Sequence, residues 1–429
     1  MSKQFFCGAF NAEQCYKEEI FASLPSFKDD SSEKIVLYSD EILFPLVEND
    51  GWFVTRAPIN EIYREYLNTL GFVFKNYSSH DFDDIRCLDI YELLLNDQKF
   101  KHSIVSGEDN LYFDTFSIIN GAKEMCKEYG IFYDYPDFNI VKKVNSKIFS
   151  SRINSLMGIS DYSKIIQSSD DFDKFSKLYN QDYLIKDPFG VSGKGIIRIN
   201  NNSVRNSICS FLRKQEANGK IVSFILEPFF NKLIDFSCQI YISKEGTIEI
   251  LSVNEMNNDG FSFSGIRAPS EELLKIIDSS NYLKTIELVG KQINLEGYYG
   301  YACIDSMVLK DERIIPVVEI NARKSMSNVK NALDRRLSIN SKKSMLSYYN
   351  FKNTNLSIGT LLEALKSKGT LFNFDRGGIL PLSSSSITIN KESDAKPYKA
   401  RLFVYYAYNT QNEFDKYVGI LTEILNSAI

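Results

Sequence analysis

A strand–turn–strand pattern at residues 301–321 constrains the fold of this chain most. Two apolar runs flank a polar turn that centres on Glu312. Asp305 and Glu319 each lie seven residues from that centre, so they face each other if the two strands pair in antiparallel fashion. Asn321 shares their face because side chains alternate along a strand. The pattern predicts a hairpin with oxygen-bearing side chains on one face.

The carboxylates of this hairpin indicate a metal site. Like charges that face each other destabilise a sheet unless a positive charge lies between them. Oxygen ligands from Asp, Glu and Asn suit Mg²⁺, which keeps substrate phosphate oxygens in its remaining positions. Asp305, Glu319 and Asn321 are therefore the candidate metal ligands. The alternative is a solvated face whose carboxylates pair with lysines, but the apolar flanks favour burial.

A glycine-rich segment, Gly190-Val-Ser-Gly-Lys-Gly195, separates two expected strands at 183–186 and 195–199. It is not a Walker A loop, because Pro188 and Gly195 stand where that motif needs glycine and Ser/Thr. It is not a GxGxxG turn either, because Arg198 takes the place of the third glycine. Free backbone N–H groups in such a loop can approach phosphate closely, and a plain hairpin turn is the alternative.

Lys186 precedes this loop on an otherwise apolar strand. Neutralisation of a phosphate is one reason for an ammonium group there. Snorkelling to the surface is the other.

Composition excludes several classes of protein. The chain has 429 residues, of which 44% are apolar and 24% charged, so we expect two or three packed domains and no wholly disordered chain. A net charge of −5 argues against nucleic acid or an anionic membrane as a partner. We find no secretory signal and no apolar run of the ~20 residues that a membrane helix needs. Seven scattered cysteines and two histidines favour a reducing cytoplasm and leave little room for histidine catalysis.

The coarse pattern of elements is α/β. Residues 34–38 and 70–75 are expected to be strands, with a helix at 59–70 between them. Asn145 or Ser146 is expected to cap a helix that ends near Gly158. Further expected elements are a helix at 203–217, antiparallel strands over 220–254, a helix at 270–294, a strand at 400–406 and a helix at 412–427.

Five short elements occur in one order over roughly 140–335. They are Lys147 in Ser-Lys-Ile-Phe-Ser-Ser-Arg, Lys186 before the glycine loop, Glu227-Pro-Phe-Phe230, Asp305, and Glu319-Ile-Asn-Ala-Arg323. Together they resemble the ATP-grasp ligases. The resemblance implies an α/β (α+β) ATP-grasp fold, with an N-terminal α/β domain (1–140), a small subdomain with the flap (141–255), a metal-binding subdomain (256–340), and a C-terminal segment (341–429) that completes or covers the active site.

The resemblance also implies roles for individual residues, with ATP and one or two Mg²⁺ ions as cofactors. Asp305, Glu319 and Asn321 would bind the metal, and Arg323 would steady the acyl phosphate or the oxyanion. ATP would contact the phosphate lysines Lys147 and Lys186, the flap residues Gly190, Ser192, Gly193 and Gly195, the adenine hinge Glu227, Phe229 and Phe230, and the ribose acid Asp235.

Two positions depart from the D-alanine–D-alanine ligase pattern. Asp235 lies one residue further along, and Cys303 stands where those ligases place an arginine, which puts a D-alanine-type substrate in doubt. Separately, Arg267 follows a flexible stretch and could clamp a substrate carboxylate, although a surface arginine is an equal alternative.

The expected reaction starts with attack of a substrate carboxylate on the γ-phosphate of ATP, which gives an acyl phosphate and ADP. An amine from an amino acid or peptide, or alternatively the thiol of an acyl-carrier protein, then attacks the activated carbonyl. Within the family, the chain resembles the pheganomycin-type peptide ligases and the carboxylate–carrier-protein ligases more than the core purine enzymes, and a homodimer would follow the habit of the family. Two rivals are a phosphotransferase and a non-catalytic ATP-binding module, although the latter would lack the metal triad.

Overall fold

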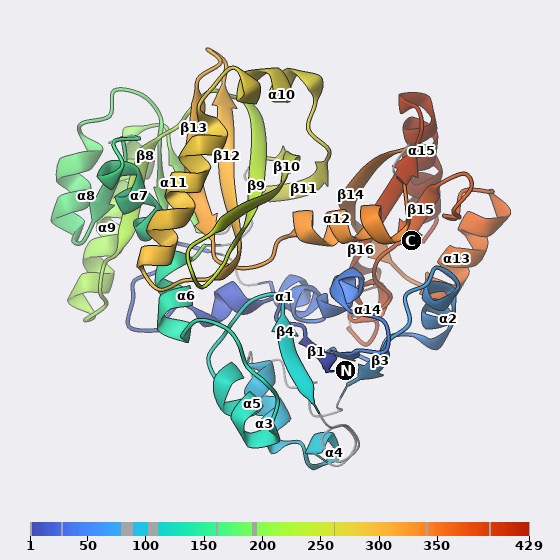
Figure 1. Ribbon diagram of the computed structural model, residues 1–429. Coiled ribbons are helices and arrows are strands. Elements are labelled where there is room, and N and C mark those ends of the chain that lie inside the picture. Colours follow the sequence, from blue (N-terminus) through green and yellow to red (C-terminus); the bar gives the residue numbers. More distant parts are fainter. Residues whose placement is uncertain are drawn as a thin grey trace.

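The computed structural model describes residues 2–26, 29–78, 89–101, 110–159, 162–190, 195–260, 262–339, 342–393 and 396–428. Three β-sheets organise this part of the chain, with helices packed against them (Figure 1). In the described residues no helix is long and apolar enough to cross a membrane.

The first sheet is parallel and has the strand order β3-β2-β1-β4. Its strands are β1 (Lys3–Cys7), β2 (Trp52–Val54), β3 (Lys75–Tyr77) and β4 (Leu111–Thr115). The helical segments around it are η1 (Ala12–Cys15), α1 (Asp30–Leu37), η2 (Asp40–Leu46), α2 (Glu61–Thr69), α3 (Ile90–Asn96), α4 (Gln98–Phe100) and α5 (Ala122–Tyr129). The expected helix at 59–70 is α2, so that expectation is confirmed.

Both strands expected in this region are wrong as assigned. Residues 34–38 belong to α1 and its C-cap, because Asp29 caps the helix by accepting from the Ser32 amide. Only part of the apolar run in α1 faces the core, at Ile35 and Leu37. Of the strand expected at 70–75, residues 70–74 form an irregular segment, and the strand begins only at Lys75.

The second sheet is small and antiparallel, with the strand order β5-β8-β6-β7. Its strands are β5 (Lys164–Ile166), β6 (Tyr183–Lys186), β7 (Ile196–Ile199) and β8 (Phe224–Pro228), and its helices are α7 (Lys147–Leu156), α8 (Ser169–Ser176) and α9 (Asn202–Ala217). Ser146 caps α7 as expected, and Gly158 follows that helix with a positive φ of 63°.

The third sheet has eight strands in the order β13-β12-β9-β10-β11-β14-β16-β15. The strands are β9 (Lys232–Ile242), β10 (Ile248–Asp259), β11 (Ser262–Arg267), β12 (Gly300–Leu309), β13 (Ile314–Asn321), β14 (Lys343–Asn353), β15 (Gly378–Pro381) and β16 (Tyr398–Tyr408). Its helices are α6 (Phe138–Val144), α10 (Glu271–Asp278), α11 (Tyr282–Leu295), α12 (Met326–Arg336), α13 (Ile358–Ser367), α14 (Ser385–Thr388) and α15 (Gln411–Asn426).

Two expectations for this region need correction. The helix expected at 270–294 is the pair α10 and α11, with a break at 279–281. The antiparallel run at 220–254 is divided between two sheets, because β8 pairs in the small sheet and β9 in the large one. The late strand and the last helix are confirmed as β16 and α15.

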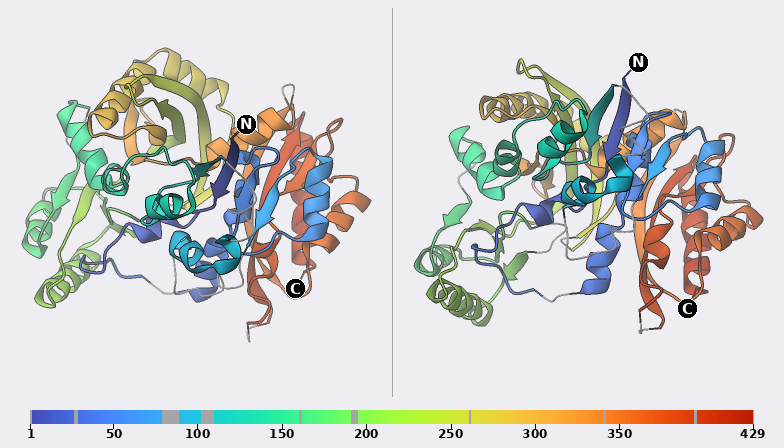
Figure 2. Two further views of the ribbon diagram at one scale, coloured as in Figure 1. Left: turned by 60° about the horizontal axis from the view of Figure 1, so that its bottom comes forward. Right: turned by 90° about the horizontal axis from the view of Figure 1, so that it is seen from below.

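The C-terminal segment lies beside the N-terminal sheet (Figures 1 and 2). Contacts between α13 and α2 and between α1 and β16 join the two parts. Because β14 also pairs with β11, residues beyond 341 extend the sheet that carries the β12–β13 hairpin. The domain limits drawn from the sequence stay a prediction.

Candidate active site

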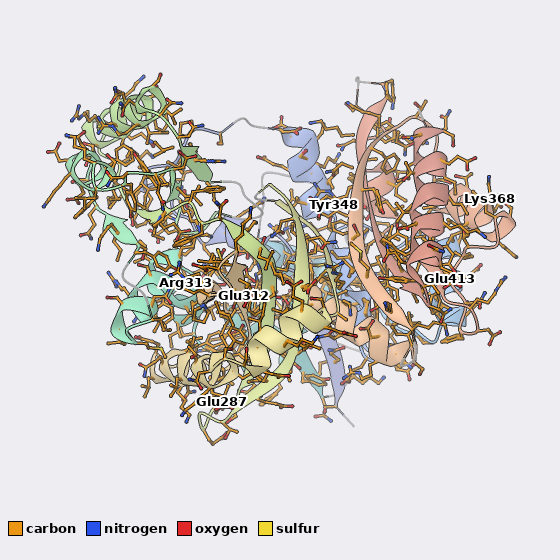
Figure 3. The ribbon with its side chains drawn as sticks, turned by 90° about the horizontal axis from the view of Figure 1, so that it is seen from above. Glu287, Glu312, Arg313, Tyr348, Lys368 and Glu413 are labelled. Carbon is orange, nitrogen blue, oxygen red and sulfur yellow. The ribbon has the colours of Figure 1, made fainter. Side chains whose placement is uncertain are left out.

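The hairpin β12–β13 has the register that the sequence predicted. Asp305 pairs with Glu319 across the two strands, and Glu312 adopts a positive φ of 64° in the turn, where Figure 3 labels it. The Asn321 side-chain amide donates a hydrogen bond of 3.1 Å to the Asp305 carboxylate. The structure therefore brings the three candidate metal ligands together.

The surroundings of Asp305 disfavour the charged form of its carboxyl group. Burial, and then the charge of Glu319, raise the pKa of the Asp305 carboxyl to about 7, against the opposing effect of Arg323. A divalent cation at this position would relieve both effects. No group of three His, Cys, Asp or Glu side chains suited to a metal occurs in the described ranges, so the site depends on two carboxylates and an amide oxygen. That hard-oxygen set fits Mg²⁺.

Lys147 joins the hairpin to the glycine loop. It is the first residue of α7, directly after the Ser146 cap. Its ammonium group donates to the Glu319 carboxylate at 2.6 Å and to the Gly190 carbonyl at 2.7 Å. The side chain is only 5% exposed, so its charge depends on these partners.

Lys186 and Glu227 form a second buried ion pair. Lys186 ends β6, Glu227 lies on the adjacent strand β8, and their exposed fractions are 6% and 8%. Lys147, Lys186 and Glu227 line one cavity between α7 and the small sheet. Each lysine is thus neutralised by a carboxylate of the same site.

The structure describes the residues on both sides of the glycine loop, up to Gly190 and from Gly195. The Asp187 amide donates to the Gly195 carbonyl at 2.7 Å, and Gly195 has a φ of +79°. A Cβ atom at Gly195 would lie 2.8 Å from the Asp187 Cβ, so only glycine fits there without rearrangement. Ser192 and Gly193 lie outside the described residues.

The residues predicted to hold adenosine lie on two sheets. The Phe229 amide donates to the Asp182 carbonyl at 2.9 Å, and the Arg198 guanidinium lies 3.9 Å from the Phe229 ring centre. Phe230 packs edge-on against Tyr162.

Asp235 lies on β9 in the large sheet. It accepts from the Asn258 side chain at 2.7 Å and pairs with Lys232. Asp235 shares the face of Asp305, since Met307 and Asp305 pair with Asp235 and Ser237.

The two predicted catalytic arginines differ in position. The Arg323 guanidinium donates to Asn321 Oδ1 at 3.2 Å, beside the metal triad. Arg267 lies on β11, with β10 and β9 between it and β12, and it pairs with Glu255 at 2.7 Å. The structure therefore does not bring Arg267 to the triad, and its role stays a prediction.

Sequence reasoning missed four charged residues that surround Arg323 and the loop base. Glu13 in η1 accepts a hydrogen bond of 2.6 Å from Arg323 Nε. Lys17 pairs with Asp187, and Lys324 pairs with Asp114 at the end of β4. Although burial opposes it, the charge of Glu13 contributes most to raising the pKa of Arg323.

No sequence motif marks Glu13, Lys17 or Asp114, because they reach the site only through the fold. Lys324 follows Arg323 directly, and that adjacency is the one signal that could have drawn attention to it.

Comparisons with known proteins give one similar curated sequence. No family model matches the chain. The chain is similar to the butirosin acyl-carrier-protein–L-glutamate ligase of Niallia circulans, with 25% identity over 313 residues, which are 70% of this chain and 67% of that protein.

Solved structures show the same fold at low identity. The N5-carboxyaminoimidazole synthetase of Staphylococcus aureus aligns with a TM-score of 0.54 and 12% identity, over 97% of this chain and 95% of that one. Its complex with ADP aligns with a TM-score of 0.53 and 12% identity, over 98% and 97%. An L-amino acid ligase from Bacillus licheniformis aligns with a TM-score of 0.53 and 13% identity, over 98% of this chain and 98% of that one.

Proposed function

We propose that this chain is a ligase with the ATP-grasp fold, in which Lys147, Lys186 and the β12–β13 hairpin activate a substrate carboxylate as an acyl phosphate. The observation that carries the proposal is the pair of neutralised lysines in one site. Lys147 bonds Glu319, which faces Asp305 across the hairpin, and Lys186 bonds Glu227 in the same cavity.

Binding of Mg–ATP would exchange the partners of these charges. The lysine ammonium groups would turn to the phosphates, and Glu319 would be released to a metal ion. Lys147 also bonds the Gly190 carbonyl, so a change at this lysine would be transmitted to the glycine loop. A closed loop would keep water from the acyl phosphate.

Asp305, Glu319 and Asn321 would hold one or two Mg²⁺ ions. When bound, Mg²⁺ neutralises charge on the phosphate oxygens. Asn321 orients the Asp305 carboxylate by its hydrogen bond and accepts from Arg323 through its oxygen. Asn321 thus connects the metal ligands to the arginine.

In the reaction, a carboxylate oxygen of the substrate attacks the γ-phosphorus and ADP leaves. An amine nitrogen then attacks the carbonyl carbon, loses a proton, and expels inorganic phosphate. Arg323 lies beside the triad and would stabilise the oxyanion that forms at the carbonyl. The substrates of this step are a small carboxylate and an amino acid or peptide.

A carrier-protein thiol is the second candidate acceptor. The similarity to the butirosin acyl-carrier-protein–L-glutamate ligase favours a thiol acceptor of this kind. A thiolate would attack the same carbonyl and need the same activated carboxylate, so the ATP site would serve either acceptor. A cytoplasmic location suits both, since the six described cysteines are free thiols.

The test is release of ADP and phosphate with Mg–ATP against pooled amino acids, small carboxylates and peptides, with mass analysis of the products. We expect stimulated ADP release and a product equal to its two substrates minus water. Asp305→Asn should abolish it, whereas Asp311→Asn, in the exposed hairpin turn, should not. ATP binding without stimulated turnover, also when a loaded carrier protein is supplied, would contradict the proposal.

A further inference from the structure

One continuous segment, residues 13–24, leaves the parallel sheet after β1 and joins the small antiparallel sheet. At its far end, Ala22 and Leu24 are buried in the apolar core of the small sheet. The Ala22 amide donates to the Ile221 carbonyl at 2.8 Å, beside a parallel bridge between Phe21 and Ile221. Figure 2 shows the blue chain after β1 reaching the green helices of the small sheet. This linking segment therefore packs as part of the small sheet at its far end.

The middle of the linking segment contacts the base of the glycine loop. Lys17 pairs with Asp187, which is 5% exposed and directly follows Lys186. The ring centre of Tyr16 lies 6.1 Å from that of Phe189. The Phe189 amide donates to the Asp187 carboxylate at 3.1 Å, so both contacts act on one short turn. The linking segment thus helps to fix the base of the loop.

The start of the linking segment holds Arg323. Glu13, in η1, accepts a hydrogen bond of 2.6 Å from Arg323 Nε. The Tyr16 hydroxyl anchors the same stretch, because it donates to the Ile118 carbonyl at 2.9 Å. Glu13 and Lys17 are the ends of five consecutive residues. A displacement of the loop base therefore reaches Arg323 through a very short piece of chain.

The charge of Arg323 is already compensated in this arrangement. A guanidinium that is paired with a carboxylate attracts a second negative charge less strongly, because the two anions repel each other. Arg323 must therefore leave Glu13 before it stabilises an oxyanion fully. The proposed exchange of partners at Lys186 takes place next to Asp187, so the same event acts on the Lys17–Asp187 pair.

We propose that the linking segment couples nucleotide binding at the glycine loop to the release of Arg323, with Lys17 and Glu13 as positioning residues. Mg–ATP displaces the loop base, the Lys17–Asp187 pair carries that displacement to η1, and Glu13 withdraws from Arg323. The guanidinium then becomes available for the oxyanion. The inference rests on the proposed function and adds an order of events, in which Arg323 is released only after the nucleotide has bound.

Hydrogen exchange measured by mass spectrometry, with and without Mg–ADP, tests this coupling. The reporter is a peptide that contains η1, where the Gln14 amide donates to the Asn11 carbonyl at 2.9 Å. We expect Mg–ADP to speed exchange in this peptide about fivefold in the wild type. Lys17→Met should remove that effect. Lys17→Arg, which keeps the charge, and Lys143→Met, in an exposed pair with Glu296, should retain it.

Coupling between two sites is reciprocal, and this gives a second test. The described residues that line the cavity of Lys147 and Lys186 do not include Glu13. If the nucleotide weakens the contact of Glu13 with Arg323, loss of the Glu13 charge must strengthen nucleotide binding. Glu13→Gln should therefore bind Mg–ADP about fivefold more tightly in calorimetric titration. Glu18→Gln, at an exposed position of the same segment, should bind it as the wild type does.

An unchanged exchange rate in η1 when the wild type binds Mg–ADP would overturn the coupling. Faster exchange in Lys17→Met in both states, with the effect of Mg–ADP retained, would also overturn it, because that result indicates a structural role. Equal or weaker binding of Mg–ADP by Glu13→Gln would contradict the release of Arg323. If the wild type binds no Mg–ADP, the proposed function fails, whereas binding without an effect on η1 contradicts only the coupling.

Discussion

Asp305 on the β12–β13 hairpin and the Asp40–Glu41 pair in η2 have carboxyl groups with raised pKa values but different surroundings. On the metal hairpin, burial and Glu319 raise the pKa of Asp305 to about 7. In η2, burial raises the pKa of Asp40 to about 7 and that of Glu41 to about 8. A raised pKa therefore does not by itself identify the functional pair.

The partners of the two pairs show the difference. Glu41 accepts from the Ser384 hydroxyl at 3.0 Å and the Ser385 amide at 3.1 Å, both next to α14. Those donors are neutral and fixed, and they hold the C-terminal segment to the N-terminal part. Glu319 is held by the positively charged ammonium group of Lys147, which a phosphate group would also attract. Exchangeable charged partners indicate a ligand site, and fixed neutral donors indicate a structural contact.

The largest expected effect is a difference in turnover between a substitution on the β12–β13 hairpin and one in η2. Glu319→Gln should lower ADP release with Mg–ATP roughly 1,000-fold, because it removes a metal ligand and the partner of Lys147. Asp40→Asn should leave turnover near that of the wild type, since Asp40 interacts with the Phe10 amide and with Arg56, neither of which belongs to the candidate site. The measurement is the steady-state rate of ADP formation. Equal losses in the two variants would contradict the distinction.

A smaller effect is expected from the second lysine pair. Lys186→Met should lower the free energy of unfolding by about 3 kcal/mol, because the Glu227 carboxylate is left buried without a partner. The double substitution Lys186→Met with Glu227→Gln should recover most of that loss, but neither variant should bind ATP. Urea unfolding and ATP titration measure the two quantities. ATP binding by the double variant would refute the phosphate role of Lys186.

The smallest effect concerns the pH dependence of stability. In the folded protein the pKa of Glu41 is about 8, above its ordinary value of 4.5. The contribution of Glu41 to the free energy of unfolding is therefore fully present below pH 4.5 and is lost as pH rises through 8. Glu41→Gln should reduce the fall in the free energy of unfolding between pH 5 and pH 8 by about 2 kcal/mol, an order-of-magnitude figure for a buried carboxyl. Urea unfolding at pH 5 and pH 8 measures it. A pH slope identical to that of the wild type would show that Glu41 is not the group that titrates.

The hairpin could be predicted in detail because its information is local. A polar turn between two alternating apolar runs sets the register of Asp305 and Glu319 through the chain itself. The same local reasoning failed at residues 34–38, where a short apolar run fits either a strand or one side of a helix. The cap formed by Asp29 favours the helix, and the pattern of apolar residues alone contains no information about that cap.

The four missed charges show where local reasoning ends. Glu13 and Asp114 lie far from Arg323 and Lys324 along the chain, and they meet only where the β1 and β4 loops pack against the end of β13. Ser192 and Gly193 lie outside the described residues, so their predicted phosphate contacts stay predictions.

By itself, the sequence determined the order of the elements that resemble the ATP-grasp ligases and the register of the β12–β13 hairpin, and it led to the prediction that Lys147 and Lys186 bind phosphate. Each of these depends on neighbouring residues, whose geometry follows from strand alternation and helix capping. Only the tertiary structure decided which charges neutralise one another. Ion pairing depends on distance in space and on burial, and both arise only when distant segments pack together.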